Sequence, residues 1–476
     1  MDNLKQKTAR GLLWGALNNG SMQVLNLLIG LVLGRLLSPG EYGIAGVLTI
    51  FTVIAGNLQS SGFSQGLINL KRPTDEDYNS VFWFNVCVSL VLYALLFAAA
   101  PLIAGFFRQP VLIEVSRVVF LAFVISSFGI AQNAYMMKNM MQREIAVSSV
   151  AALALSGGVS IALALSGKSY WSLVWQQIVY ITVLNAGRYF YSPWRPSLRF
   201  SIGPIRRMFA FSVKILLTNI LNTLSQNLLT FIFGRLFSIS TVGNFSQANK
   251  WNTMASTTIA NTLHQVAQPV LVSVRDERQR ELKVFRKMVR FTAFLSFPAL
   301  FGLALVAREF ILCTIGPAWT GCVPLLQLLC VSGAFMPLTT LYQNLVISHG
   351  RSDVNLWLNI GQIVVQIAIV LLFYRQGVTV MVLVYSLFNI VWTAAWQPFA
   401  RRLIGLGWLS LLSDTAPFML IAAATTGLTH WLTLGIGDLR LLLLARIVTA
   451  AALYYAAMRL LHVAILQECM QFIKRK

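Results

Sequence analysis

Long apolar stretches separated by short polar segments run along the whole 476-residue chain. Each stretch approaches or exceeds the roughly 20 residues that cross the hydrocarbon layer of a bilayer, and none shows the alternation of a barrel strand. The pattern therefore predicts an all-α polytopic membrane protein with fourteen spans, or with twelve as the alternative count. The predicted spans lie near residues 11–34, 44–67, 81–106, 118–137, 146–166, 169–187, 208–233, 243–271, 291–307, 321–347, 355–374, 378–399, 415–436 and 441–461.

The chain also repeats itself. The decapeptide GRLLSPGEYG at residues 34–43 returns as GRLFSISTVG at residues 234–243, in both cases after an apolar run. Such a duplication is typical of transporters built from two similar halves. We expect two pseudo-symmetric six-helix lobes at residues 1–191 and 208–402, a linker at 192–207, and two extra helices with a basic tail at 403–476.

Composition and charge support this class of protein. Hydrophobic residues make up 57% of the chain, charged residues 11%, and the mean hydropathy is +0.70. The net charge of +22 resides mostly in alternate short loops, which predicts a multi-pass topology with both termini cytoplasmic and attraction to anionic membrane lipids. The same distribution argues against nucleic-acid binding. The five cysteines lack metal-ligand spacing, and we find no cofactor motif.

Two hydrophilic segments stand out among the predicted cytoplasmic ones. Residues 192–207 contain Pro193, Pro196, Gly203 and Pro204, which discourage a continuous helix and suit a hinge between lobes. Residues 273–290 are strongly basic with apolar positions on one face, which fits either an amphipathic helix on the membrane surface or a solvated loop.

The distribution of charge within the spans is uneven. All fifteen Asp and Glu residues are expected in loops or termini, including Glu309 in an external loop and Asp414 as an N-cap ahead of the thirteenth span. Lys214, Lys250 and Arg446 fall inside spans, where a charge is costly. A cationic interior without carboxylates favours an anionic ligand. For Lys250 the alternative is an anchor that snorkels to the interface, and an anchor is the preferred interpretation of Arg446.

Polar residues at helical spacing extend the candidate site. Two amide stripes and the neighbouring Gln247 line a predicted cavity or else join helices, one central histidine either couples protons or packs in the core, and two helix-end arginines either anchor the helices or attract an anion. These residues are Asn19, Gln23, Asn26, Asn219, Asn222, Gln226, Gln247, His264, Arg35 and Arg235.

Several segments resemble one known family. GRLLSPGEYG, SSGFSQGLINLK, VFWFNV, LNTLSQNLLTFIFGRL and GPAWTGCVPLLQLLCVSG are similar to the Wzx-type flippases, the polysaccharide-exporter branch of the multidrug/oligosaccharidyl-lipid/polysaccharide (MOP) superfamily, and most of all to the colanic-acid exporter group. The resemblance covers most of residues 1–400. It implies two lobes around a central cavity that opens alternately to each side. It also implies that Lys214 and Lys250 meet the diphosphate of a polyprenyl-linked glycan, and that the last two spans lie beside the polyprenyl tail.

The expected function is a flippase in the bacterial inner membrane that moves an undecaprenyl-diphosphate-linked oligosaccharide repeat unit to the external leaflet for surface polysaccharide assembly. It changes no covalent bond, so we expect a transporter and not an enzyme. A lipid II flippase or a drug/proton antiporter on the same fold is the alternative cargo. A membrane glycan polymerase or ligase is the alternative class, although the external loops are short. The sequence leaves open whether the protein acts as a monomer or with a glycan polymerase.

Overall fold

The computed structural model describes residues 2–209, 212, 213, 216, 230, 232–461, 463, 465 and 466. The described part of the chain is built from helices. They are α1 (Asp2–Leu36), α2 (Pro39–Asn69), α3 (Asp75–Phe107), α4 (Leu112–Ser127), α5 (Ile130–Lys138), α6 (Gln142–Leu165), α7 (Trp171–Tyr191), α9 (Ile239–Val274), α10 (Arg278–Thr314), η1 (Pro317–Trp319), α11 (Cys322–Gly333), α12 (Met336–Ser348), α13 (Ser352–Phe373), η2 (Tyr374–Gln376), α14 (Val378–Ala394), α15 (Gln397–Ile404), α16 (Trp408–Leu432) and α17 (Leu439–Leu460).

These helices confirm the predicted fold class of a helical membrane protein. Thirteen of the predicted spans overlap a helix or a pair of consecutive helices, and the remaining one, 208–233, lies mostly outside the described residues. Within the described ranges, nine helical segments are long and apolar enough to cross a membrane, or ten if the bent α4–α5 pair is one span. The protein is therefore a multi-pass membrane protein.

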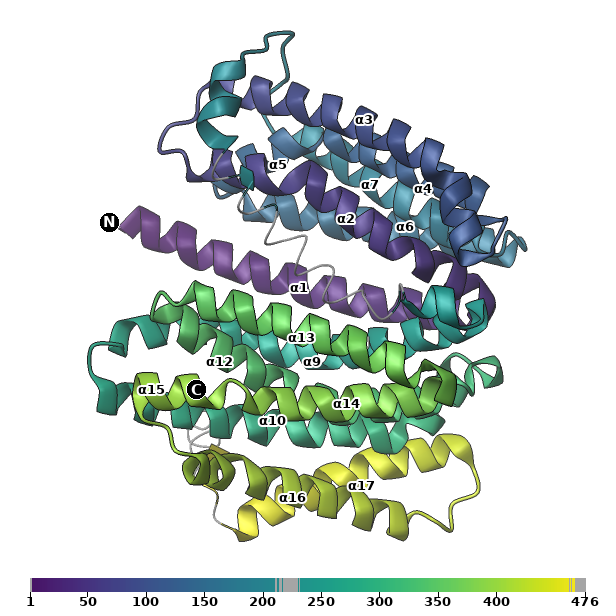
Figure 1. The fold of residues 1–476 in the computed structure, drawn as a ribbon, viewed down its shortest axis with the longest axis vertical. Coiled ribbons are helices and arrows are strands. Elements are labelled where there is room, and N and C mark those ends of the chain that lie inside the picture. The colour runs from purple at the N-terminus through teal and green to yellow at the C-terminus, as the bar shows by residue number, and fades with distance from the viewer. Residues whose placement is uncertain are drawn as a thin grey trace. The chain divides into compact units, whose positions relative to one another are not determined.

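The chain divides into two compact units, residues 1–243 and 244–476. In the first unit, α1 packs on α6, α6 on α7, α7 on α4, and α4 on α3 (Figure 1). In the second unit, α10 is the central helix, because it contacts α11, α12, α16 and α17. The last two helices, α16 and α17, therefore pack on a helix of the lobe that precedes them.

The fourth predicted span of each half is a broken helix. In the first unit, α4 and α5 meet at a bend of 44°. The side chain of Asn185 on α7 donates to the backbone carbonyl of Ile125 at 2.5 Å, and a Cβ at Gly129 would lie only 1.9 Å from Asn185 Oδ1. The break thus depends on a glycine at the bend and on an amide that satisfies a carbonyl near the end of α4.

The second unit breaks the corresponding span between α11 and α12. Ser296 on α10 donates to the carbonyl of Ala334 at 2.6 Å, and Pro337 occupies the first turn of α12. Because proline lacks an N–H, it suits the start of a new helix better than the middle of a continuous one. The two halves thus share a helix break as well as a sequence repeat.

The structure explains why both copies of the repeated decapeptide end in glycine. A Cβ on Gly43 would lie 1.9 Å from the backbone oxygen of Ile239, and a Cβ on Gly243 would lie 1.7 Å from the backbone oxygen of Pro39. These four positions are equivalent under the 200-residue offset of the repeat. The first turns of α2 and α9 therefore cross at a reciprocal contact that only glycine permits.

The predicted linker, residues 192–207, is packed and partly helical. Residues 202–209 are helical, with Gly203 and Pro204 in the first turn, where proline is tolerated. Trp194, Ile205 and Met208 are buried in a cluster that includes α3 residues. This segment is therefore packed within the first unit. As expected, no continuous helix spans it, since residues 192–201 are not helical and a helix begins only at residue 202.

The basic segment 273–290 is neither a separate surface helix nor a solvated loop. Val274 ends α9, and α10 begins at Arg278 and continues without a break to Thr314. Phe285 and Val289 are fully buried, because the apolar face of this extension packs inside the protein. The amphipathic pattern was correct, but its apolar face covers protein instead of lipid.

Candidate functional site

The candidate site centres on Lys250 in α9. Its ammonium lies 5.7 Å from the centroid of the Trp251 ring, and Trp251 packs edge-on against Phe310 of α10 at 5.2 Å. No hydrogen bond or carboxylate pairs with Lys250 among the described residues. A ring face stabilises a cation by about 0.5–2 kcal/mol, less than a buried carboxylate partner can offer. The lysine charge therefore remains available to an anion.

The stretch of α9 that carries Lys250 also carries unsatisfied polar atoms. Between Asn244 and Asn252, six buried side-chain atoms have no hydrogen-bond partner among the described residues: Asn244 Oδ1, Ser246 Oγ, both polar atoms of Gln247, Trp251 Nε1 and Asn252 Oδ1. Leaving one such atom buried and unpaired costs about 1–3 kcal/mol. A stretch of one helix that carries six of them is suited to a polar ligand that would satisfy them.

Helix α11 and the turn before it hold two of these amides in position. A Cβ at Gly333 would lie 2.1 Å from Asn252 Oδ1, and a Cβ at Gly321 would lie 2.9 Å from Asn244 Nδ2. The two asparagines are eight residues apart and so share a face of α9. This face packs on glycines, which leaves the amides little freedom to rotate.

The first amide stripe lies on α1. Asn19 is exposed and Asn26 is half-buried, and neither side chain forms a hydrogen bond with the described residues. The packed face of α1 is formed by Ile29 and Leu33. Neither Asn19 nor Asn26 therefore joins α1 by a hydrogen bond to α6, its main neighbour within the unit. Gln23 belongs to the same stripe and is half-buried.

Several predicted site residues fall where the structure gives no description. Lys214, Asn219, Asn222 and Gln226 lie outside the described residues. His264 lies in α9, but its side chain is also outside the described part. Their roles remain predictions.

The two repeat-equivalent arginines differ in their contacts. Arg235 donates to the backbone carbonyl of Phe106 at 2.7 Å and lies 5.2 Å from the Phe106 ring centroid. Because Phe106 lies in the last turn of α3, this contact places a cation at the negative end of that helix, as an anchor would. Arg35 is exposed in the last turn of α1.

The expectation that no span contains a carboxylate was wrong. Glu309 lies inside α10 with 2% of its side chain exposed, and its Oε1 is 2.9 Å from Arg446 Nη1 on α17. Arg446 also contacts Thr433 and the Nδ1 of His430, the latter at 2.9 Å. It is thus a buried, paired cation and not an interfacial anchor. A carboxylate is tolerated there because the arginine beside it offsets its desolvation.

Asp414 was also misplaced by the sequence pattern. Helix α16 begins at Trp408, about two turns earlier than predicted, so Asp414 is inside the helix and buried. Its carboxylate accepts two hydrogen bonds from Arg286 on α10, at 2.6 and 3.0 Å, and lies 3.4 Å from Arg290. The bidentate pairing with Arg286 takes the place of the predicted N-cap role.

An apolar groove lies along α10, α16 and α17 in the second unit. Its volume is about 490 Å³, and Phe294, Leu303, Ile447 and Tyr454 are among its lining residues. Arg446 is the only charged residue that lines it among those described. The groove therefore suits a hydrocarbon chain.

Helix α13 carries a further polar stripe, which was not predicted. Asn355, Asn359, Gln362 and Gln366 follow the spacing i, i+4, i+7 and i+11 on α13. The side chains of Gln362 and Gln366 each donate to Asn389 Oδ1 of α14 at 3.0 Å. The same spacing rule that revealed the stripe on α1 would have found it. These bonds join α13 to α14, so the stripe serves at least as an interhelical contact.

Comparison with known proteins decides the family. Residues 32–324, more than half of the chain, match the family described as polysaccharide biosynthesis protein. The chain belongs to this family. The chain is also similar to the lipopolysaccharide biosynthesis protein WzxC of Escherichia coli, at 24% identity over 75% of this chain and 73% of the length of WzxC. The succinoglycan biosynthesis transport protein ExoT of Rhizobium meliloti is 24% identical over 85% and 80%, respectively.

Solved structures of two transporters share this fold. The lipid II flippase MurJ in an inward closed conformation has a TM-score of 0.77 at 11% identity and matches 96% of this chain and all of its own. A multidrug resistance MATE family transporter in an inward-facing conformation has a TM-score of 0.65 at 16% identity, over 80% of this chain and 94% of its own. The resemblance inferred from the sequence motifs, to polysaccharide exporters of this superfamily, is confirmed.

Proposed function

We propose that this family member is a flippase that carries an undecaprenyl-diphosphate-linked oligosaccharide repeat unit across the bacterial inner membrane by alternating access. Its cargo would move from the cytoplasmic to the external leaflet and feed the assembly of a surface polysaccharide. Both chain termini would be cytoplasmic, as the distribution of Lys and Arg predicts.

The observation that carries this proposal is the environment of Lys250. An ammonium that is unpaired among the described residues, on a helix that also carries buried unsatisfied amides, offers a charge to a diphosphate and hydrogen bonds to sugar hydroxyls. Each charge-assisted hydrogen bond contributes about 1.5–3 kcal/mol, enough to offset part of the cost of drawing a phosphate out of water. Relatives with biosynthesis and transport names support a glycan as the cargo.

The polyprenyl tail would lie in the groove along α10, α16 and α17. That groove is apolar over most of its length, so an isoprenoid chain can remain out of water while the head group crosses. An inside-negative potential would assist the outward step, by ~2.3 kcal/mol for each charge that crosses 100 mV.

A lipid II flippase is the main rival, since the fold is the same. The match to a polysaccharide biosynthesis family favours a surface glycan instead. A glycan polymerase or ligase is a rival of another class, and it would lengthen glycans in purified membranes, whereas a flippase only relocates them.

The test is mass spectrometry of polyprenyl-linked glycans from cells with and without the gene. We expect the deletion to accumulate a complete, unpolymerised repeat unit that an external glycosidase cannot reach. Accumulation of lipid II together with loss of viability would support the rival cargo. Absence of any accumulated lipid-linked glycan would contradict the proposal.

A further inference from the structure

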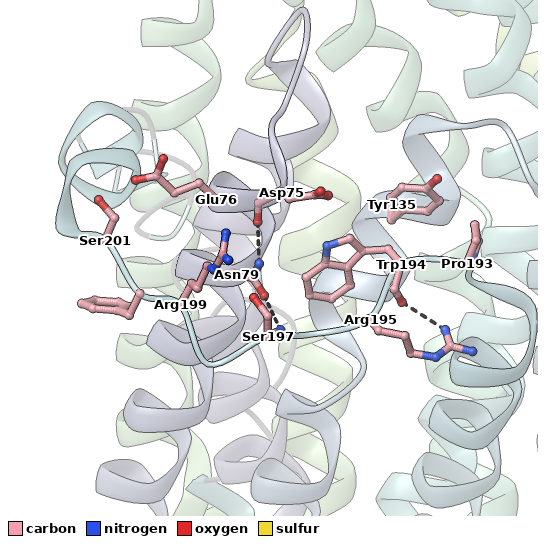
Figure 2. A pocket seen from close by; sticks show the side chains of 11 residues that line it. Asp75, Glu76, Asn79, Tyr135, Pro193, Trp194, Arg195, Ser197, Arg199 and Ser201 are labelled. Carbon is pink, nitrogen blue, oxygen red and sulfur yellow. Dashed lines mark hydrogen bonds between the residues drawn. The ribbon is translucent and has the colours of Figure 1, made fainter.

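A second pocket lies in the first unit, whereas Lys250 belongs to the second unit. Its volume is about 750 Å³, within the usual range for ligand sites, and it is formed by the first turns of α3, by α5 and by residues 193–201. Figure 2 shows Asp75 and Glu76 above Asn79, Ser197 and Arg199 beside Asn79, and Trp194 further along the same segment. The charge pattern predicts that this end of the unit faces the cytoplasm.

The lining of this pocket has an unusual composition. Apart from Pro193, every lining side chain is charged, polar or aromatic, and no Leu, Ile, Val, Met or Ala contributes. Among the described residues, Asp75, Glu76 and Arg199 form no ion pair with any side chain. Tyr135 is half-buried and Phe200 is 55% exposed, so ring surface is accessible beside these charges. The pocket thus offers free acceptors, a free donor group and ring faces together.

The walls of the pocket are held by hydrogen bonds that do not involve the side chains of Asp75, Glu76 or Arg199. Asn79 Oδ1 accepts from the backbone N–H of Ser197 at 2.7 Å, and Trp83 Nε1 donates to the carbonyl of Ser197 at 2.7 Å. Further along, Ser80 Oγ accepts from the N–H of Ser201 at 3.1 Å. The extended segment 193–201 is therefore held against α3 through its backbone, and a ligand would not have to order it first.

This chemistry selects one class of ligand. Carboxylates accept hydrogen bonds from hydroxyl groups, a guanidinium donates to ring and hydroxyl oxygens, and aromatic rings pack on the C–H faces of a pyranose. Two free carboxylates disfavour a phosphate. No group of three metal-ligating side chains occurs in the described ranges, which leaves a metal ion without a complete site. A short oligosaccharide satisfies every group.

We propose that this pocket binds the glycan of the cargo on the cytoplasmic side before transport, and so selects the completed repeat unit. This inference rests on the proposed flippase function, and it adds a recognition site separate from Lys250. Asp75 and Glu76 accept sugar hydroxyls, and Arg199 donates to sugar oxygens.

The experiment uses the full chain in lipid nanodiscs. The probe is the mixture of short oligosaccharides obtained by partial acid hydrolysis of the surface polysaccharide of cells that carry the gene. Binding is read by saturation-transfer NMR and quantified by titration. The test variant combines Asp75→Asn with Glu76→Gln, which leaves the capping pair of Thr74 and Asp77 intact. Asp276→Asn, at an exposed acid outside the pocket, is the matched control.

We expect the wild-type protein and the control to bind at least one oligosaccharide, and the double variant to bind it at least about tenfold more weakly. Equal binding by the double variant, or no binding by the wild type, would overturn the proposal. Binding of a Lys-rich peptide in place of sugars would also overturn it, because the pocket would then be a protein docking site.

Failure of the pocket inference can be distinguished from failure of the proposed flippase function. If the deletion strain accumulates a repeat unit but the pocket binds no sugar, only the pocket inference fails. If no repeat unit accumulates, the flippase proposal fails whatever the pocket binds. An Arg199→Gln variant with weakened binding and normal thermal unfolding would place the loss in recognition and not in folding.

Discussion

Arg446 of α17 and Glu309 of α10 form a buried ion pair, with 2.9 Å between Nη1 and Oε1. A second pair, Arg286 with Asp414, joins α10 to α16 at 2.6 Å. Arg286 lies near the start of α10 and Glu309 near its end, so the two pairs lie on opposite halves of that helix. The apolar groove runs along the same three helices. The two extra helices are therefore fixed to the preceding lobe at two separate points.

The first prediction concerns the Arg446–Glu309 pair. Replacing either partner alone by Leu leaves the other charge buried and unpaired, and we expect a loss of roughly 3–5 kcal/mol in the free energy of unfolding. Replacing both together should restore most of that loss, because neither charge then needs a partner. Thermal unfolding of the single and double variants in detergent measures the cycle.

Arg440→Leu is the control for this cycle, since Arg440 is exposed at the start of α17. A double variant that is less stable than both single variants would show that the pair is not the interaction that matters. A single variant as stable as the wild type would lead to the same conclusion.

The second prediction concerns the glycines of the repeat. Gly43→Ala and Gly243→Ala each place a Cβ within 2 Å of a backbone oxygen, so both should lower the unfolding temperature or the yield of folded protein. Gly40→Ala lies in the same decapeptide, where the nearest neighbouring atom would be 3.9 Å away, and it should be tolerated. Fluorescence-detected size exclusion at increasing temperature compares the three variants. Tolerance at Gly43 equal to that at Gly40 would contradict the reciprocal crossing.

The membrane-spanning helices could be predicted from the sequence, but the buried carboxylates and the helix breaks could not. Apolar runs of about 20 residues reveal spans reliably, because hydrocarbon excludes unpaired backbone groups. The same reasoning misplaced Glu309 and Asp414, because it assumed that a carboxylate ends a span. A partner on another helix removes that restriction, and the sequence of one helix does not reveal the partner. The breaks after α4 and α11 were missed for a similar reason, since Asn185 and Ser296 stabilise them from other helices.

The candidate site was predictable only in part. Lys250 and Gln247 stood out because charged and amide groups are rare in apolar spans. Whether the side chains of Gln247 and Asn252 find hydrogen-bond partners depends on how the helices pack around them, and the sequence does not reveal this. The pocket beside α3 was beyond prediction, because it is formed when residues 193–201 return to side chains more than 100 positions earlier.

The third prediction concerns pH. Burial raises the pKa of Glu41, but hydrogen bonds from Ser169 and Ser38 outweigh it and hold the pKa below its ordinary value of 4.5. A lowered pKa in the folded state means that ionised Glu41 stabilises the fold above about pH 4.5, and that this contribution is lost as the pH falls through the folded-state pKa. Glu41→Gln should therefore lower the unfolding temperature at pH 7, and its difference from wild type should shrink below pH 4.5. A difference that stays constant across this range would rule out the carboxylate as its source.

The fourth prediction separates stability from transport at Gln247. Both polar atoms of this buried side chain lack partners, so Gln247→Leu should raise the free energy of unfolding by up to about 1–3 kcal/mol. The same variant should lower transport, because the amide would otherwise bind the cargo. Thermal unfolding and accumulation of lipid-linked glycan in a complemented deletion strain provide the two readouts. A variant that is more stable and fully active would mean that the amide has no part in cargo binding.

The fifth prediction concerns Lys250 itself. Lys250→Ala removes a charge that no carboxylate balances in the described part of the chain, so we expect normal folding and membrane insertion but a loss of transport of about 10- to 100-fold. Lys250→Arg should retain part of the activity, because it keeps the charge but changes the geometry of its donors. Lys283→Ala, at an exposed lysine of α10, is the matched control and should transport normally. Since both alanine variants remove one positive charge, a difference between them isolates the position from the net charge. Wild-type transport by a stably inserted Lys250→Ala protein would exclude this lysine from the path of the cargo.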